Sequence, residues 1–174
     1  MFFDPLAETI SAYNRMAATY SKRWFQADAV STFVQQFIDL LPKNASVLDA
    51  GCGSGREIAA LISHGVDCVG VDLSAETILM ARRNVPDGYF RVMDFRSLDY
   101  PTSMFDGILC IASLHHLFDD DFTLALSSFS RVLKSGGKLA LTVRLGEGHS
   151  YDSYGRFQYF RSVDQVLSAA TRSG

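Results

Sequence analysis

The sequence constrains its own fold most strongly at a glycine-rich segment, D-A-G-C-G-S-G, which occupies residues 49–55. The apolar pair Val47 and Leu48 comes directly before this segment, and apolar residues at helical spacing follow it from Ile58 onward. A strand, a glycine loop and a helix in this order form the ligand-binding turn of a doubly wound α/β domain. Glycine suits such a turn because it adopts positive φ and lets a ligand lie against the bare backbone.

The spacing of the glycines excludes two common nucleotide-binding motifs. A dinucleotide fingerprint that starts at Gly51 requires glycine or alanine at position 56, where Arg56 would crowd a pyrophosphate. The G-x-x-x-x-G-K-[ST] motif of phosphate-binding loops is also missing from the sequence. The motif D-x-G-x-G-x-G instead resembles the first motif of class I S-adenosylmethionine-dependent methyltransferases, and further motifs follow in that family's order and spacing.

This resemblance implies S-adenosylmethionine as the cofactor and S-adenosylhomocysteine as its product. It also implies a set of cofactor-binding residues, namely Tyr20, Asp49, Gly51, Gly53, Gly55, Asp72, Leu73, Asp94, Phe95 and Ala112. Within this set, Asp49 is expected to order the amides of the loop, and the three glycines are expected to give backbone access to the ligand.

An acidic residue closes the next apolar segment. Asp72 follows residues 68–71 and lies 21 positions beyond Gly51, where a nucleotide-binding α/β unit places the acid that binds a ribose diol. A helix N-cap is the alternative role for Asp72, but Ser74 already occupies that position before the next helix. The sequence therefore favours Asp72 as the ribose ligand.

Two further segments resemble cofactor contacts of the family. Asp94, after the short predicted strand 89–92, resembles the carboxylate at the adenine edge, although it could simply cap the following turn. Residues 5–41 predict two helices, the second over 30–41, that form a cap on the sheet. In the first helix, Tyr13 and Tyr20 resemble the aromatic residues of a lid that folds over the cofactor.

The predicted strand 105–112 ends in a loop that contains His115 and His116. Ligands of open α/β sheets bind at the carboxyl ends of the strands, so either histidine could act as a base on the methyl acceptor. Each histidine, taken alone, is more often a hydrogen-bonded structural residue. The acidic run at residues 119–121 is typical of a helix start, and no metal site is predicted there.

The last part of the chain predicts a helix end, a glycine turn and a fifth strand over residues 139–143. An aromatic loop over 146–160 could line the acceptor pocket or pack on the surface, and a final helix is expected over 162–171. We therefore expect a three-layer, doubly wound and mostly parallel sheet in the order 3-2-1-4-5. It would lack the family's hairpin of strands 6 and 7.

Such a sheet leaves the fifth strand as an apolar edge, which proteins normally pair or cover. We expect the chain to be a fragment of a longer protein. Alternatively, a second chain covers this edge in a dimer, or the rearranged tail does.

Length and composition fit a single domain, with a helical cap over 1–44, a cofactor-binding core over 45–144 and an acceptor-side segment over 145–174. A formal net charge of −3 without a basic stripe makes nucleic acid an unfavoured partner. The three cysteines are expected to be buried reduced thiols of a cytoplasmic protein, and the sequence lacks an apolar run long enough for a membrane span.

The resemblance implies methyl transfer by direct in-line displacement, and the low charge and aromatic segment favour a small-molecule acceptor. One alternative is a modified tRNA nucleoside, because residues 146–160 distantly resemble enzymes that act on such nucleosides. The other is a protein that binds S-adenosylmethionine or S-adenosylhomocysteine without catalysis.

Overall fold

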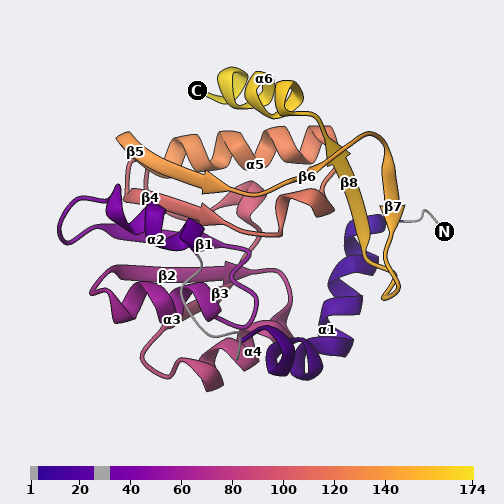
Figure 1. Cartoon of the computed structure of the whole chain (residues 1–174), viewed down its shortest axis with the longest axis horizontal. Helices are drawn as coiled ribbons and strands as arrows, with labels where there is room; N and C mark the ends of the chain where they lie inside the picture. The colour runs from indigo at the N-terminus through magenta and orange to yellow at the C-terminus, as the bar shows by residue number, and fades with distance from the viewer. Residues whose placement is uncertain (1–3, 26–31) are drawn as a thin grey trace.

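A computed structural model describes residues 4–25 and 32–174 and contains a central five-stranded parallel sheet in the order β3-β2-β1-β4-β5 (Figure 1). The strands of this sheet are β1 (Ser46–Ala50), β2 (Asp67–Asp72), β3 (Tyr89–Val92), β4 (Phe105–Cys110) and β5 (Leu133–Leu141). The predicted fold class and strand order are confirmed.

Helices surround this sheet. The α-helices are α1 (Pro5–Trp24), α2 (Thr32–Asp39), α3 (Arg56–Ser63), α4 (Ala75–Asn84), α5 (Asp119–Val132) and α6 (Val163–Ser173), and the short 3-10 helices are η1 (Phe95–Ser97) and η2 (Leu114–His116). The predicted second helix begins in the structure at Thr32, and Val30 lies outside the described residues.

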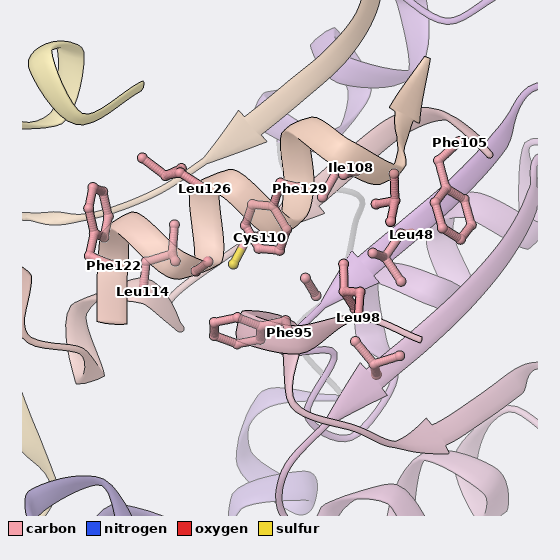
Figure 2. Close-up of a cluster of buried hydrophobic side chains, with 14 of the residues drawn as sticks. Leu48, Phe95, Leu98, Phe105, Ile108, Cys110, Leu114, Phe122, Leu126 and Phe129 are labelled. Carbon is pink, nitrogen blue, oxygen red and sulfur yellow. The ribbon is translucent and has the colours of Figure 1, made fainter. Parts of the chain in front are cut away.

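The sheet is covered on both faces, which makes the domain three layers thick. Leu48 and Ile108 belong to one buried cluster, which includes side chains of α5 (Figure 2). Their neighbours Val47 and Leu109 belong to a second cluster, which includes side chains of α3 and α4. Successive side chains of a strand point to opposite faces, so adjacent apolar residues in β1 and β4 each reach a different core.

Helix α1 packs against α4 and also contacts β8 and η2 (Figure 1). Asp4 caps its first turn by accepting hydrogen bonds from the backbone amides of Leu6 and Ala7. Further along the helix, Asn14 Oδ1 accepts from the Ser74 hydroxyl at 2.7 Å. These contacts hold the predicted cap over the carboxyl edge of the sheet.

The aromatic segment after β5 differs from the prediction. Where a loop is expected over 146–160, the structure has a small sheet in the order β6-β8-β7, made of β6 (Arg144–Leu145), β7 (His149–Tyr151) and β8 (Phe157–Arg161). Strands β7 and β8 form an antiparallel hairpin, and the side chain of Phe157, the first residue of β8, is fully buried. The prediction is wrong here because strands of two to five residues, separated by glycines, carry too little period-2 pattern.

The fifth strand begins earlier than expected, at Leu133 instead of position 139. The predicted glycine turn is present as an irregularity within β5, because the pairing with β4 shifts between Phe105 and Gly107, and Gly136 has a φ of 76°. Of the strands that the structure describes, only β4 pairs with β5, as expected for the edge of the sheet.

Helix α6 confirms the predicted last helix and starts with a capping box between Ser162 and Gln165. Within residues 4–25 and 32–174, no helix is long and apolar enough to cross a membrane.

Candidate functional site

The glycine loop connects β1 to α3 and is hydrogen-bonded to the end of β2, at the carboxyl edge of the sheet. The backbone carbonyl of Val71 accepts hydrogen bonds from the amides of Gly51 at 2.8 Å and Cys52 at 3.0 Å. Gly51 has a φ of 83°, and a Cβ atom there would lie 2.1 Å from Ser113 Oγ. Only glycine therefore lets the ends of β1 and β4 come this close.

Asp72 lies at the end of β2 and binds the same loop. Its Oδ2 accepts from the Gly53 amide at 3.0 Å, and its Oδ1 accepts from the Ser74 amide at 2.8 Å. Ser74 itself caps α4 by accepting from the amide of Thr77, as the sequence predicts. A carboxylate offers about four lone-pair sites, so Asp72 retains acceptor capacity for a ligand. Burial raises the pKa of Asp72 above its usual value, while the two amides lower it.

Two neighbouring cavities lie between this loop, α1 and η2. The first cavity is lined by Leu6, Thr9, Ile10, Tyr13, Tyr20, Gly51, Gly53, Asp72, Leu73, Asp94, Phe95, Ile111, Ala112, Ser113, His116 and Leu117. The second cavity is lined by Tyr13, Tyr20, Trp24, Gly51, Cys52, Gly53, Ser54, Arg56, Glu57, Ile111, Ala112, His115, Arg144 and Arg156. Because six residues line both cavities, an elongated ligand can extend from one into the other.

Most of the residues predicted for the site line these cavities. Those in the first or second cavity are Tyr20, Gly51, Gly53, Asp72, Leu73, Asp94, Phe95, Ala112, His115 and His116. Asp49 and Gly55 line neither. Gly55 is the N-cap of α3, and a Cβ atom there would lie 3.1 Å from Phe90 Cζ and 3.3 Å from Ala81 Cβ. Gly55 therefore allows close packing of the loop against Phe90 and Ala81, and its predicted contact with the ligand stays a prediction.

Asp49 is buried in β1, between β2 and β4, and its Oδ2 atom has no hydrogen-bond partner within the described residues. Burial raises the pKa of Asp49 well above its usual value, and the nearby carboxylates of Glu57 and Asp72 raise it further. Two amides of the loop bind the Val71 carbonyl, and a third binds Asp72, while the expected role of Asp49 in ordering the loop stays a prediction.

Asp94 performs the capping role that the sequence left open as an alternative. Its Oδ1 accepts from the Arg96 amide at 2.9 Å, and its Oδ2 pairs with the Arg96 guanidinium at 2.6 Å. Arg96 also pairs with Asp121 at 2.8 Å. Asp94 still lines the first cavity, beside Phe95, so the cap and a ligand contact are compatible.

His116 is hydrogen-bonded at both ring nitrogens. Nδ1 lies 2.5 Å from the carbonyl oxygen of Phe157, which can only accept, so Nδ1 carries the proton. Nε2 then accepts from the Tyr13 hydroxyl at 3.1 Å, and this hydroxyl accepts from Arg156 Nη1 at 2.9 Å. Burial lowers the pKa of His116 to about 4. His116 therefore connects η2 to α1 and β8 as a neutral structural residue.

His115 is equally buried but differently placed. Its ring centroid lies 4.2 Å from that of His116, and it lines the second cavity. Among the hydrogen bonds of the described residues, none involves a ring nitrogen of His115. Burial, with His116 and two arginines nearby, lowers the pKa of His115 to about 3. The imidazole is therefore neutral and keeps a free lone pair, as a proton acceptor requires.

Several cavity residues were not predicted. Trp24 continues the aromatic face of α1, with ring centroids 5.4 Å apart for Tyr13 and Tyr20 and 6.4 Å apart for Tyr20 and Trp24. The helical spacing of these three aromatic residues is a signal that could have identified Trp24.

Arg156 lies directly before β8 and belongs to residues 146–160, for which the sequence leaves a pocket wall and surface packing open, and it lines the second cavity. Among the described residues, no cluster of His, Cys, Asp or Glu could hold a metal ion.

The chain is similar to known methyltransferases in both sequence and fold. A protein-family model described as a methyltransferase domain matches residues 48–141. Among curated proteins, the chain is 38% identical over 109 residues to the S-adenosyl-L-methionine-dependent Diels-Alderase iccD of Talaromyces variabilis, covering 58% of this chain and 37% of that protein. The chain spans less than half the length of the first two curated relatives that it matches, since the matched region covers 37% of one relative and 44% of the other.

Solved structures share the fold over most of the chain. The structure of Burkholderia thailandensis 1,6-didemethyltoxoflavin-N1-methyltransferase, with bound 1,6-didemethyltoxoflavin and S-adenosylhomocysteine, matches with a TM-score of 0.80 at 22% identity, covering 99% of this chain and 80% of that chain. A TehB-like S-adenosylmethionine-dependent methyltransferase from Corynebacterium glutamicum matches with a TM-score of 0.71 at 25% identity, covering 92% and 83%.

Because His116 is buried, the stability of the folded protein should depend on pH. Its pKa is about 4 in the folded protein and about 6.5 in the unfolded chain, so the unfolded state binds the extra proton between these values. Stability should therefore fall as the pH falls from 6.5 to 4, by about 1–2 kcal/mol at pH 5 for this residue.

The measurement is the thermal midpoint at pH 7 and pH 5 for the wild type and for His116→Asn, whose amide can still donate to the Phe157 carbonyl. The other titrating groups cancel in this comparison, so the wild type should lose several degrees more than the variant on acidification. Equal losses would show that His116 does not couple folding to protonation.

Proposed function

The chain belongs to the class I S-adenosylmethionine-dependent methyltransferase family, and from this premise we propose that it methylates a small-molecule acceptor by direct in-line displacement. One observation carries the proposal. Two connected cavities meet at the glycine loop, with the Asp72 carboxylate in the first and the unpaired imidazole of His115 in the second. The first cavity would hold the nucleoside part of the cofactor, and the second would hold the acceptor.

The residues present fit this cofactor. Asp72 keeps lone pairs for a ribose diol, and Gly53 exposes bare backbone, since a Cβ atom there would meet only Tyr20, at 3.6 Å. The buried ring of Phe95 lies in the same cavity as the Asp94 carboxylate, which suits an adenine ring and its exocyclic amine. Tyr13 and Tyr20 of α1 would close the site from the opposite side.

When bound, S-adenosylmethionine supplies an activated methyl group, and its transfer leaves S-adenosylhomocysteine. The protein therefore mainly has to orient the acceptor, a proximity effect worth about 7–11 kcal/mol in well-oriented systems. The aromatic side chains of α1 would hold the acceptor against the loop. His115 would take a proton from an acceptor whose nucleophile must lose one, while His116 holds η2 in place.

The three segments of the chain would divide this work. Residues 1–44 would supply the lid, 45–144 the cofactor site, and 145–174 the wall of the acceptor cavity through Arg156. A small molecule is favoured over a tRNA nucleoside because the acceptor cavity is bounded by aromatic side chains and the chain lacks a basic stripe.

A second candidate function follows from the curated relative of Talaromyces variabilis, whose name describes a Diels-Alderase dependent on the same cofactor. Such an activity would use the bound cofactor without consuming it. The two functions differ in one product, because only methyl transfer generates S-adenosylhomocysteine. Release of this product in the presence of an acceptor panel therefore tests the proposal directly.

Substitution of Asp72 tests the cofactor site. Asp72→Asn removes a charged acceptor beside the first cavity, so we expect the affinity for S-adenosylhomocysteine to fall about 10- to 150-fold. Asp67→Asn, at the exposed other end of β2, is the matched control and should bind normally. Calorimetric titration gives both affinities, and an unchanged dissociation constant for Asp72→Asn would refute the assigned role.

Substitution of His115 tests the proton acceptor. For an acceptor that loses a proton, His115→Gln should lower turnover on the order of 10²-fold while the affinity for S-adenosylhomocysteine stays constant. His64→Gln, at the exposed end of α3, controls for the loss of a histidine. Turnover is measured with methyl-labelled cofactor, and full activity of His115→Gln would leave His115 as a structural residue.

A further inference from the structure

The second cavity carries more positive than negative charge. Its charged lining residues are Arg56, Glu57, Arg144 and Arg156. Arg56 pairs with Glu57, and Arg156 pairs with Asp152 at 2.6 Å. Arg144 has no carboxylate partner within residues 4–25 and 32–174. One positive charge in this cavity is therefore left without a counterion from the protein.

The groups around Arg144 do not compensate for this charge. His115 is neutral, because burial and the neighbouring cations lower its pKa to about 3. Burial raises the pKa of Tyr13 far above neutral pH, so its hydroxyl stays protonated. The proposed cofactor carries a sulfonium, an ammonium and a carboxylate, which add one further positive charge to the site.

Arg144 has a fixed backbone position. It is the first residue of β6, close behind the end of β5, and it pairs with Phe160 of β8. The small sheet therefore fixes the start of this side chain beside the second cavity, which His115 also lines. A guanidinium in such a place can bind a carboxylate through two parallel hydrogen bonds.

The uncharged walls of the second cavity favour a flat ligand. Tyr13, Tyr20 and Trp24 form a continuous aromatic face along α1, with Tyr13 and Tyr20 packed edge to face. Aromatic side chains arranged in this way pack well against planar rings.

We propose that the methyl acceptor is a planar small molecule that carries a carboxylate, and that Arg144 is the residue that selects for this charge. The inference rests on the proposed function for the identity of the two cavities. It goes beyond that function by giving the acceptor a charge and by assigning the specificity to one side chain. Opposite charges in a partly enclosed cavity raise both the affinity for the correct acceptor and the penalty against a neutral one.

The chain contains a built-in reporter for the test. Trp24 is its only tryptophan and lines the second cavity, so its fluorescence should respond to a ligand that enters there. The protein is first saturated with S-adenosylhomocysteine, whose affinity is measured separately by calorimetry. It is then titrated with benzoate, 2-naphthoate and quinoline-2-carboxylate, each compared with its own primary amide.

We expect each carboxylate to bind about tenfold or more tightly than its amide. Arg144→Gln should abolish this preference, and Arg144→Lys should retain part of it because the charge remains. Arg172→Gln makes the same change in net charge on α6, beside a separate cavity, and should keep the full preference. The affinity for S-adenosylhomocysteine should be the same in all four proteins.

Three results would overturn the inference while leaving the proposed function standing. They are equal or undetectable binding of carboxylates and amides, a preference that survives Arg144→Gln, and weaker binding of S-adenosylhomocysteine by Arg144→Gln. The last result would assign Arg144 to the cofactor. Failure of the wild type to bind S-adenosylhomocysteine would instead contradict the proposed function and remove the inference with it.

Discussion

The structure depends most on the attachment of the glycine loop to the end of β2. The Val71 carbonyl accepts two amides of the loop, and the Asp72 carboxylate accepts a third, from Gly53. These bonds satisfy backbone donors that would otherwise be unpaired at a buried turn. They also fix where β1 ends, where α3 begins and which backbone faces the ligand. The same carboxylate that organises the loop therefore also lines the first cavity.

The opposite wall of the site is held by a chain of hydrogen bonds between distant segments. Asp152 orients Arg156, Arg156 donates to the Tyr13 hydroxyl, and this hydroxyl donates to His116. His116 completes the chain by donating to the Phe157 carbonyl. Helix α1, η2 and the small sheet are thus connected at one point, and the neighbouring His115 lines the second cavity without a hydrogen-bond partner among the described residues. Two adjacent histidines with the same burial therefore have different hydrogen-bond partners.

The sequence predicts well the features that depend on local pattern. The role of Ser74 as a helix cap follows from residues within a few positions of one another, and the end of β2 at Asp72 follows from the apolar run before it. The strand order comes instead from the resemblance to the methyltransferase family, whose motifs occur in order along the chain. The small sheet could not be predicted in this way. Its two-residue strand β6 is defined only by pairing with β8, 16 residues further on, which sequence periodicity does not reveal.

The same limit applies to the candidate site. His115 and His116 are indistinguishable in sequence, because their difference comes from partners that lie 41 and 103 positions away from His116. Gly55 was expected to face the ligand because its spacing matches that of Gly51 and Gly53. Its packing against Phe90 depends on how β3 is placed beside β2, which the loop sequence does not encode.

A crystal structure of the protein with S-adenosylhomocysteine would show whether the two cavities hold the two halves of a methyl-transfer site, as we propose. We expect the ribose hydroxyls to lie within hydrogen-bond distance of the Asp72 carboxylate, and the sulfur atom to lie where the cavities meet, open toward His115. A ligand bound away from Asp72, or one whose sulfur atom is separated from the second cavity, would refute this assignment of the two cavities.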